Sequence, residues 1–155
     1  MKKCRFFIAF LLLLVPIAVG QKINLDTAPY APDGWSIAEN HGSGQLEWNS
    51  SRIQLYLSAS QKSGRYIRGY KVRKELAGKK VLNANALDFL LAHQDLIPKS
   101  WKGKNVYFWG TIYVDKTGDR LVRSLYWHES SGSWNWNASG LSQVWNENHP
   151  AVIVE

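Results

Sequence analysis

The chain has almost no cysteine. Cys4 is its only one, and it lies in a predicted leader that export would remove. A mature chain starting at Gln21 would carry no thiol, which excludes a disulfide framework, a cysteine nucleophile and a cysteine-ligated metal. Stability must then come from buried apolar side chains. Residues 21–155 are numerous enough for one domain with its own core.

Only one long apolar run is present, and it lies at the N-terminus. Lys2, Lys3 and Arg5 precede an apolar stretch over residues 6–19, and small residues at 18–20 offer a cleavage site. The run is shorter than the roughly 20 residues a spanning helix needs, although a retained anchor is the alternative. We therefore expect a signal peptide over residues 1–20 and a single exported α+β domain over residues 21–155. The mature protein would be secreted or periplasmic, with membrane contact only through the signal peptide before cleavage.

The positive charge is smaller than it first looks. The chain has 19 Lys and Arg against 12 Asp and Glu. The predicted signal peptide holds three of the basic residues and none of the acidic ones, so the mature chain has a net charge of +4. That value is ordinary for a soluble domain, and we expect no nucleic-acid partner.

Motifs for catalysis and cofactor binding are also missing. There is no G-x-S-x-G and no Gly-rich phosphate loop. The four histidines, His41, His93, His128 and His149, form no H-x-H or H-x-x-x-H pair, so no metal site and no cofactor is expected. Spacing selects no pair among the carboxylates that could serve a glycosidase, namely Glu47, Glu75, Asp88 and Glu129.

Tryptophan, by contrast, is abundant. All eight Trp residues lie after residue 20, and the densest aromatic stretch spans residues 106–136. β-Branched and aromatic residues there predict three short antiparallel strands, joined by turns that contain Gly118 and Gly132. We expect a small, mostly antiparallel sheet, with this three-stranded meander at its centre, packed against at least one helix.

Turn type fixes the expected register of the meander. If both turns are type I with a following bulge, Val114 pairs with Arg120 and His128 with Trp134. One face then carries Val106, Phe108, Gly110, Ile112, Val122, Ser124, Tyr126, His128, Trp134 and Trp136. The other carries Tyr107, Trp109, Thr111, Tyr113, Leu121, Arg123, Leu125, Trp127, Asn135 and Asn137. A slip of one residue in a turn would exchange the faces of a strand.

The remaining elements are simpler. A helix over about residues 84–92 is predicted, with Asn83 or Asn85 as its cap and an apolar stripe on one side. Residues 52–58 alternate like a strand, and residues 66–70 are expected to pair with it. Residues 151–154 are expected to add an edge strand.

The mixed face supplies the candidate binding residues. These are Trp109, Trp127, Arg123, Tyr107 and Asn135. Aromatic rings beside amide and guanidinium donors suit a glycan, whose C–H faces stack while its hydroxyls form hydrogen bonds, or a protein partner. The alternative is that another element covers this face and the rings are core. Arg123 would then pair with an acid such as Asp88 rather than with an anionic ligand group.

The second half of the chain resembles a group of small uncharacterised bacterial proteins, over about residues 81–153. The residues that carry the resemblance include Leu82-Asn83-Ala84-Asn85, Leu87-Asp88, Leu90-Leu91, Leu96-Ile97-Pro98, Trp101-Lys102-Gly103-Lys104, Val122-Arg123, Leu125-Tyr126-Trp127 and Pro150-Ala151-Val152. The block from Phe108 to Tyr113 is its most specific part. Where that group has further aromatic residues after the last strand, this chain has Asn137-Ala138-Ser139-Gly140. The resemblance implies a bacterial origin and no activity.

These observations favour a non-catalytic binding or interaction module. Two alternatives stay open: a small cell-wall or glycan hydrolase with carboxylates that the sequence does not identify, and a structural domain without a ligand.

Overall fold

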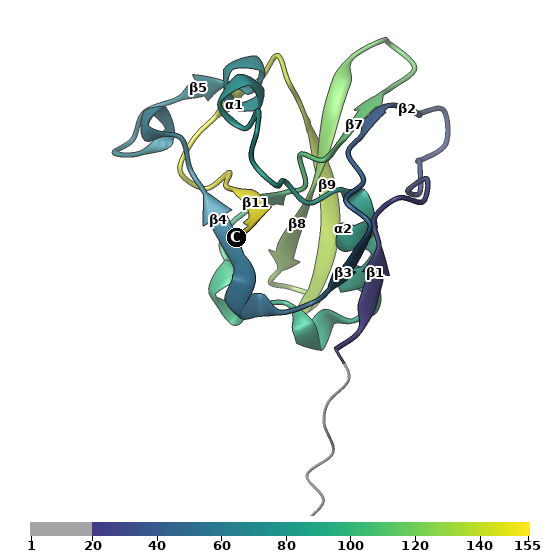
Figure 1. Cartoon of the computed structure of the whole chain (residues 1–155). Coiled ribbons are helices and arrows are strands. Elements are labelled where there is room, and N and C mark those ends of the chain that lie inside the picture. The colour runs from purple at the N-terminus through teal and green to yellow at the C-terminus, as the bar shows by residue number, and fades with distance from the viewer. Residues whose placement is uncertain (1–19) are drawn as a thin grey trace, which may run out of the picture.

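The computed structural model describes residues 20–155 and has an α+β fold (Figure 1). Seven strands form a curled, half-barrel sheet in the order β2-β7-β8-β6-β11-β4, and β9 pairs with β8 off this path. These strands are β2 (Ser36–Asn40), β4 (Ile53–Tyr56), β6 (Val106–Tyr107), β7 (Thr111–Val114), β8 (Arg120–His128), β9 (Ser133–Gly140) and β11 (Ala151–Val154). All their pairings are antiparallel except that of β11 with β6. The predicted fold class is confirmed.

Smaller elements complete the fold. Two two-stranded sheets pair β1 (Lys22–Asn24) with β3 (Gln45–Glu47), and β5 (Ile67–Arg68) with β10 (Val144–Trp145). The helices are α1 (Gly69–Glu75) and α2 (Ala84–Ala92). Short 3₁₀ turns span Ser50–Arg52, Ala59–Gln61, Gln94–Leu96 and Lys99–Trp101. Residues 66–70 were predicted to pair with residues 52–58, and this is wrong, because β5 pairs with β10 instead.

The predicted signal peptide lies, except for Gly20, outside the described residues. Within residues 20–155 no helix combines the length and the apolar character that crossing a membrane requires. Export therefore stays a prediction.

The first turn of the meander forms as predicted. The Asp115 carboxylate accepts hydrogen bonds from the backbone N–H groups of Thr117 (2.8 Å) and Asp119 (3.0 Å). Gly118 has a φ of 88°, a left-handed conformation that a side chain would strain. Val114 pairs with Arg120, so the predicted register of this hairpin is confirmed.

The second turn differs from the prediction by one residue. His128 pairs with Ser133 and Trp127 with Trp134, because the Gly132 N–H closes the turn directly onto the His128 carbonyl at 2.9 Å. A shift of one residue reverses the faces of β9. Trp134 and Trp136 thus lie on the face of Leu125 and Trp127, and Asn135 and Asn137 lie on the opposite face.

The first predicted strand is interrupted at Gly110. A Cβ at this position would lie 2.8 Å from three atoms of Asn83, so only glycine allows these two segments of the backbone to approach so closely. The Gly110 N–H donates to the Leu82 carbonyl (2.9 Å), and the Gly110 carbonyl accepts from the His41 N–H (2.7 Å). At Gly110 the chain is therefore not paired with β8. On either side of this break, β6 pairs with β8 with Val106 opposite Leu125, and β7 pairs with β8 with Tyr113 opposite Leu121. The predicted apolar face is therefore divided between two cores.

Helix α2 begins where it was predicted. The Asn83 side chain accepts a hydrogen bond from the Asn85 N–H and caps the helix. Its amide nitrogen also donates to the carbonyls of Leu25 (2.7 Å) and His41 (3.3 Å). A fully buried asparagine thus joins the N-terminal segment, the residue that follows β2, and α2.

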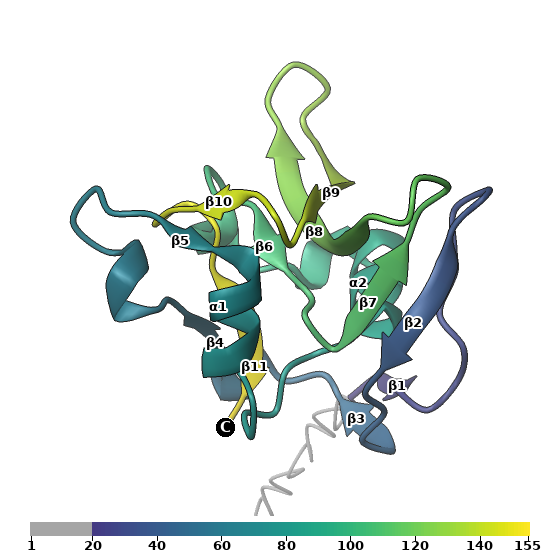
Figure 2. The same cartoon turned by 90° about the horizontal axis from the view of Figure 1, so that it is seen from above.

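The two cores lie on opposite faces of the sheet. Successive residues of a strand point to opposite faces, and Val106 and Tyr107 accordingly belong to different clusters. The core next to α2 includes Leu87, Leu90, Phe108, Leu125 and Trp134. The core next to α1 includes Val72, Tyr107, Trp109, Val122 and Trp145. Figure 2 shows α1 close to β5 and β10, and away from α2.

His149 is expected to make stability depend on pH. Its imidazole is half-buried, 5.8 Å from the ring centroids of both Tyr107 and Trp145, and burial lowers its pKa from the ordinary 6.5. The neutral ring also accepts a hydrogen bond at Nδ1 from the Asn146 N–H (3.1 Å). Because the folded pKa is depressed, this stabilisation is present above pH 6.5 and is lost as the pH falls through the folded pKa.

Urea unfolding at pH 7.5 and at pH 5 measures this effect. We expect the wild-type protein to lose more free energy of unfolding between the two values than His149→Gln does. The other titrating groups contribute equally to both proteins and cancel in the difference. Equal losses would contradict the prediction.

Candidate functional site

The five predicted binding residues do not share one exposed face. Trp109, Tyr107 and Arg123 are buried, with 4%, 2% and 1% of their surface exposed. Trp127 and Asn135 are half-buried. The expectation of a single aromatic binding surface is wrong, because the interruption at Gly110 and the register of β9 distribute these residues over both faces of the sheet.

Three of the five lie on the α1 side. Tyr107 and Trp109 pack against Trp145, with ring centroids 4.1 and 4.9 Å away. The Tyr107 hydroxyl is hydrogen-bonded to Ser139 Oγ at 2.7 Å, and burial raises the pKa of Tyr107 against the opposing effect of that hydrogen bond. Asn135, on β9, has its side chain on this face too. These contacts make Tyr107 and Trp109 part of the core, which was the stated alternative.

Trp127 lies on the α2 side beside a shallow depression. Its ring meets that of Trp134 edge-on at 5.6 Å, and Lys102 Nζ lies 3.4 Å from its centroid. The depression has a volume of about 300 Å³. The cation already occupies one face of the indole, so Trp127 offers little free ring to a ligand.

Arg123 forms the predicted ion pair with Asp88. Its Nη2 lies 2.8 Å from Asp88 Oδ1 and its Nη1 lies 3.3 Å from Oδ2, which is a bidentate arrangement. The Arg123 side chain is 1% exposed and that of Asp88 is 32% exposed. The guanidinium is thus enclosed, while the carboxylate reaches the surface.

Aromatic rings surround the same guanidinium. The Arg123 Cζ atom lies 4.4 Å from the ring centroid of Trp136, 5.5 Å from that of Tyr30 and 6.0 Å from that of Tyr113. Trp35 adds a fourth ring, 5.7 Å from Tyr113 and 6.3 Å from Trp136. We call Tyr30, Trp35, Tyr113 and Trp136 the aromatic cluster.

The outer part of the aromatic cluster faces solvent. Tyr30 is 59% exposed and Trp136 is 36% exposed, whereas Trp35 is half-buried. Tyr113 is buried and donates its hydroxyl to the Tyr30 carbonyl at 2.9 Å. Burial raises the pKa of Tyr113, and the adjacent Arg123 opposes the shift. The result is a surface with two open rings beside a partly exposed carboxylate.

Sequence reasoning missed most of this cluster. Tyr30 and Trp35 lie in a segment without a readable pattern, and only the three-dimensional structure brings them to Arg123. Trp136 was assigned to the core because of the one-residue difference in the second turn. Only the Arg123–Asp88 pair could be inferred, from the rule that a buried charge needs a partner.

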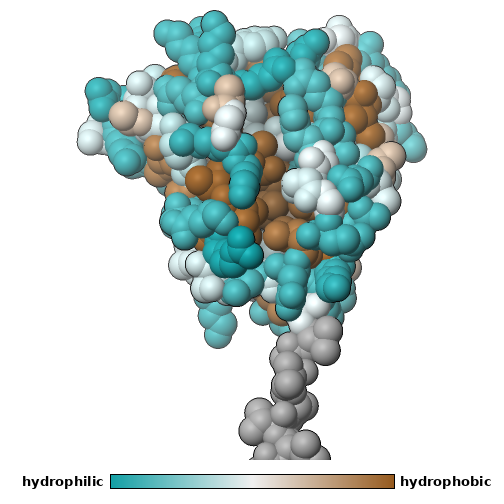
Figure 3. All heavy atoms as spheres, viewed as in Figure 1, coloured by the Kyte–Doolittle hydropathy of each residue, from teal (hydrophilic) through white to brown (hydrophobic). Residues whose placement is uncertain are grey.

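A separate cleft opens between the segment that contains β3 and the connection from α1 to α2. Its volume is about 750 Å³, and Figure 3 shows hydrophobic atoms gathered in a hollow between hydrophilic flanks on this side of the molecule. Apolar side chains form the floor: Leu46, Leu76, Val81, Leu82, Trp109 and Val154. Polar and charged side chains form the rim: Glu39, His41, Ser43, Gln45, Glu47, Arg52, Arg73, Lys79 and Lys80.

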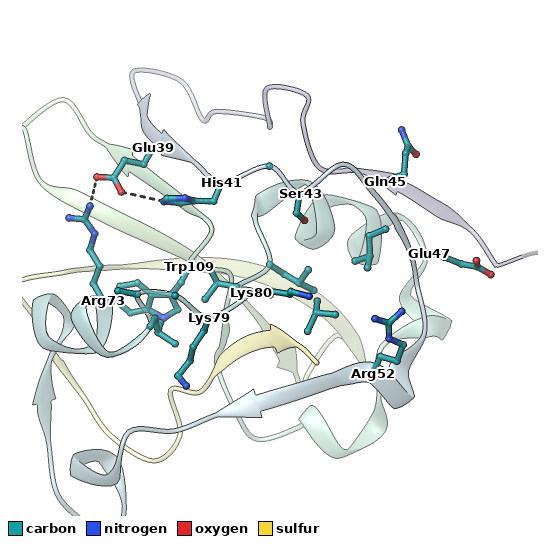
Figure 4. Close-up of a pocket in the computed structure, with 18 residues that line it drawn as sticks. Glu39, His41, Ser43, Gln45, Glu47, Arg52, Arg73, Lys79, Lys80 and Trp109 are labelled. Carbon is teal, nitrogen blue, oxygen red and sulfur yellow. Dashed lines mark hydrogen bonds and ion pairs between the residues drawn. The ribbon is translucent and has the colours of Figure 1, made fainter.

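Glu39 is the centre of an ion network at one end of the cleft (Figure 4). Its Oε1 is hydrogen-bonded to Arg73 and lies 3.2 Å from Arg120 Nη1, and its Oε2 lies 3.7 Å from His41 Nε2. A carboxylate and an imidazole therefore converge here. Both arginines bind the same carboxylate oxygen, which resembles structural ion pairing more than a general base.

A metal site is the other kind of chemistry to consider. Among residues 20–155, no group of three or more His, Cys, Asp or Glu side chains could hold a metal ion.

Comparisons with protein-family models, curated proteins and solved structures found no match for this chain.

Proposed function

We propose that the protein is a non-catalytic binding module, exported by a bacterium, that recognises a glycan through the aromatic cluster. The observation that carries the proposal is the stacking of Trp136 on the buried Arg123 guanidinium at 4.4 Å. A ring held in this way stays in place without a ligand, so less conformational entropy is lost on binding.

The surface chemistry supports a glycan. Exposed Tyr30 and Trp136 offer aromatic surface to the C–H groups of a sugar ring. Asp88 keeps part of its carboxylate at the surface, where it can accept hydrogen bonds from sugar hydroxyls. The ion pair with Arg123 fixes the position of that carboxylate. A protein partner is the alternative ligand, because Trp, Tyr and Arg are also common at interface hot spots.

Binding to insoluble peptidoglycan and to chitin tests the proposal. We expect the wild-type chain to sediment with one of them, and Trp136→Ala and Tyr30→Ala each to weaken binding about tenfold or more, as loss of a hot-spot ring does. Tyr66→Ala is the matched control, because Tyr66 is 65% exposed and lies outside the cluster. Circular dichroism establishes that each variant is folded.

Three outcomes have distinct meanings. Wild-type binding by both folded cluster variants would remove the aromatic cluster from the site. Absence of binding to any glycan would overturn the glycan proposal and direct the same variants to a search for a protein partner. Weakening by Tyr66→Ala alone would place the site elsewhere.

A hydrolase is the second candidate, and the convergence of Glu39 and His41 at 3.7 Å in the cleft favours it. If it is correct, incubation with the same polysaccharides should release reducing ends, and His41→Ala should abolish the release. A lack of release at any pH between 4 and 9 would contradict it.

A further inference from the structure

The cleft combines an apolar floor with an unbalanced charge. Leu76, Leu82 and Trp109 are buried at its base, and Leu46, Val81 and Val154 are half-buried around them. Its volume of about 750 Å³ lies within the range of small-molecule sites, which are mostly apolar with a few polar groups that orient the ligand.

The acidic end of the cleft is already neutralised. Glu39 is held by two arginines, Arg73 and Arg120, and faces His41 as well. Figure 4 shows the Glu47 side chain directed away from the cavity. Neither carboxylate is therefore placed to compensate a cation near the middle of the cleft.

The opposite wall carries cations with few partners. No ion pair between described residues includes Lys79 or Lys80. Lys79 Nζ lies 4.8 Å from the ring centroid of Tyr56, and Arg52 donates to the main-chain oxygen of Glu155 at 3.2 Å. Lys80, on the rim, has its amino group on the side of Arg52 (Figure 4). The Lys80 ammonium is thus a positive charge beside apolar surface.

We propose that this cleft binds a single-chain amphipathic anion, a free long-chain carboxylate. Its carboxylate lies at Lys80 with Arg52 nearby, and its hydrocarbon chain covers the apolar floor toward Trp109. Burial of the chain supplies the affinity, and the ammonium selects the anionic form over a neutral one. This site is independent of the aromatic cluster and does not rest on the proposed glycan binding.

Calorimetric titration of the full chain with laurate and with dodecanol, both kept below micelle formation, tests the proposal. We expect laurate to bind about tenfold more tightly than dodecanol. Lys80→Glu should weaken laurate binding at least about tenfold and leave dodecanol binding unchanged, because the reversed charge repels only the carboxylate. Lys62→Glu is the matched control, since it reverses an exposed lysine outside the cleft.

Further measurements distinguish binding of a free carboxylate from binding to a membrane and from unselective apolar binding. Vesicles of phosphatidylglycerol present anionic acyl chains as a membrane, and binding to vesicles without binding to monomeric laurate would overturn the proposal. Equal affinity for laurate and dodecanol, or an unchanged laurate affinity in Lys80→Glu, would also overturn it. Trp136→Ala should bind laurate as the wild type does, which keeps this test distinct from that of the aromatic cluster.

Discussion

Replacing Trp109 with alanine is expected to lower the free energy of unfolding by about 3–5 kcal/mol, as truncation of large core aromatics does. The indole is 4% exposed, and its ring packs 4.9 Å from that of Trp145. Removing it leaves a void between α1 and the sheet, because the neighbouring Gly110 is fixed against Asn83 and cannot collapse into the space. Urea denaturation followed by circular dichroism measures the change.

The control for this prediction is an aromatic residue at the surface. Tyr66→Ala should change stability by no more than about 0.5 kcal/mol, because Tyr66 is 65% exposed. A folded Trp109→Ala protein with a loss below about 1 kcal/mol would contradict the core assignment. It would restore the hypothesis that Trp109 serves binding.

Removing the carboxylate of Asp88 is expected to lower the free energy of unfolding by about 2–4 kcal/mol. Breaking a buried ion pair strands a charge, and Arg123 is 1% exposed with its Nε atom already lacking a partner among the described residues. We place the value below that for a fully enclosed pair because the Asp88 side chain is 32% exposed. Trp136, Tyr30 and Tyr113 retain some attraction for the guanidinium and do not replace the carboxylate.

A double-mutant cycle isolates this interaction. Asp88→Leu should be strongly destabilised, and adding Arg123→Met should recover much of the loss, because apolar side chains of similar volume can replace a buried pair. The changes in unfolding free energy of the two single variants are compared with that of the double variant. If they add up to it within about 0.5 kcal/mol, the coupling is contradicted. Glycan binding by the double variant shows in addition whether the Arg123–Asp88 pair as a whole is needed for recognition.

Local features of the fold could be predicted from the sequence. The helix over Ala84–Ala92 follows from an Asn cap and a leucine stripe, and β4 over Ile53–Tyr56 follows from strict alternation. The hairpin register at Val114 and Arg120 follows from the requirement of Gly118 for a positive φ. Each depends on residues close together in the chain.

The parts that could not be predicted depend on contacts between distant segments. The interruption at Gly110 exists because Asn83 lies against it, and nothing near Gly110 in sequence indicates that contact. The second turn uses one residue more than expected, and that single residue moved Trp136 from the interior to the surface. The cleft combines residues 39–52 with residues 73–82, Trp109 and Val154, and the aromatic cluster brings Tyr30 to Arg123.

Strand β11 constrains how the chain can be made. It lies between β4 and β6 and pairs with both, yet it comes from residues 151–154 (Figure 1). During synthesis, β4 emerges from the ribosome long before the strand that will flank it, so the sheet cannot be completed until residues 151–154 are available. The long sequence separation between β4 and β11 favours slow folding and leaves a strand edge exposed in the meantime. Slow completion of the sheet would prolong the unfolded state, which suits the export that the sequence predicts.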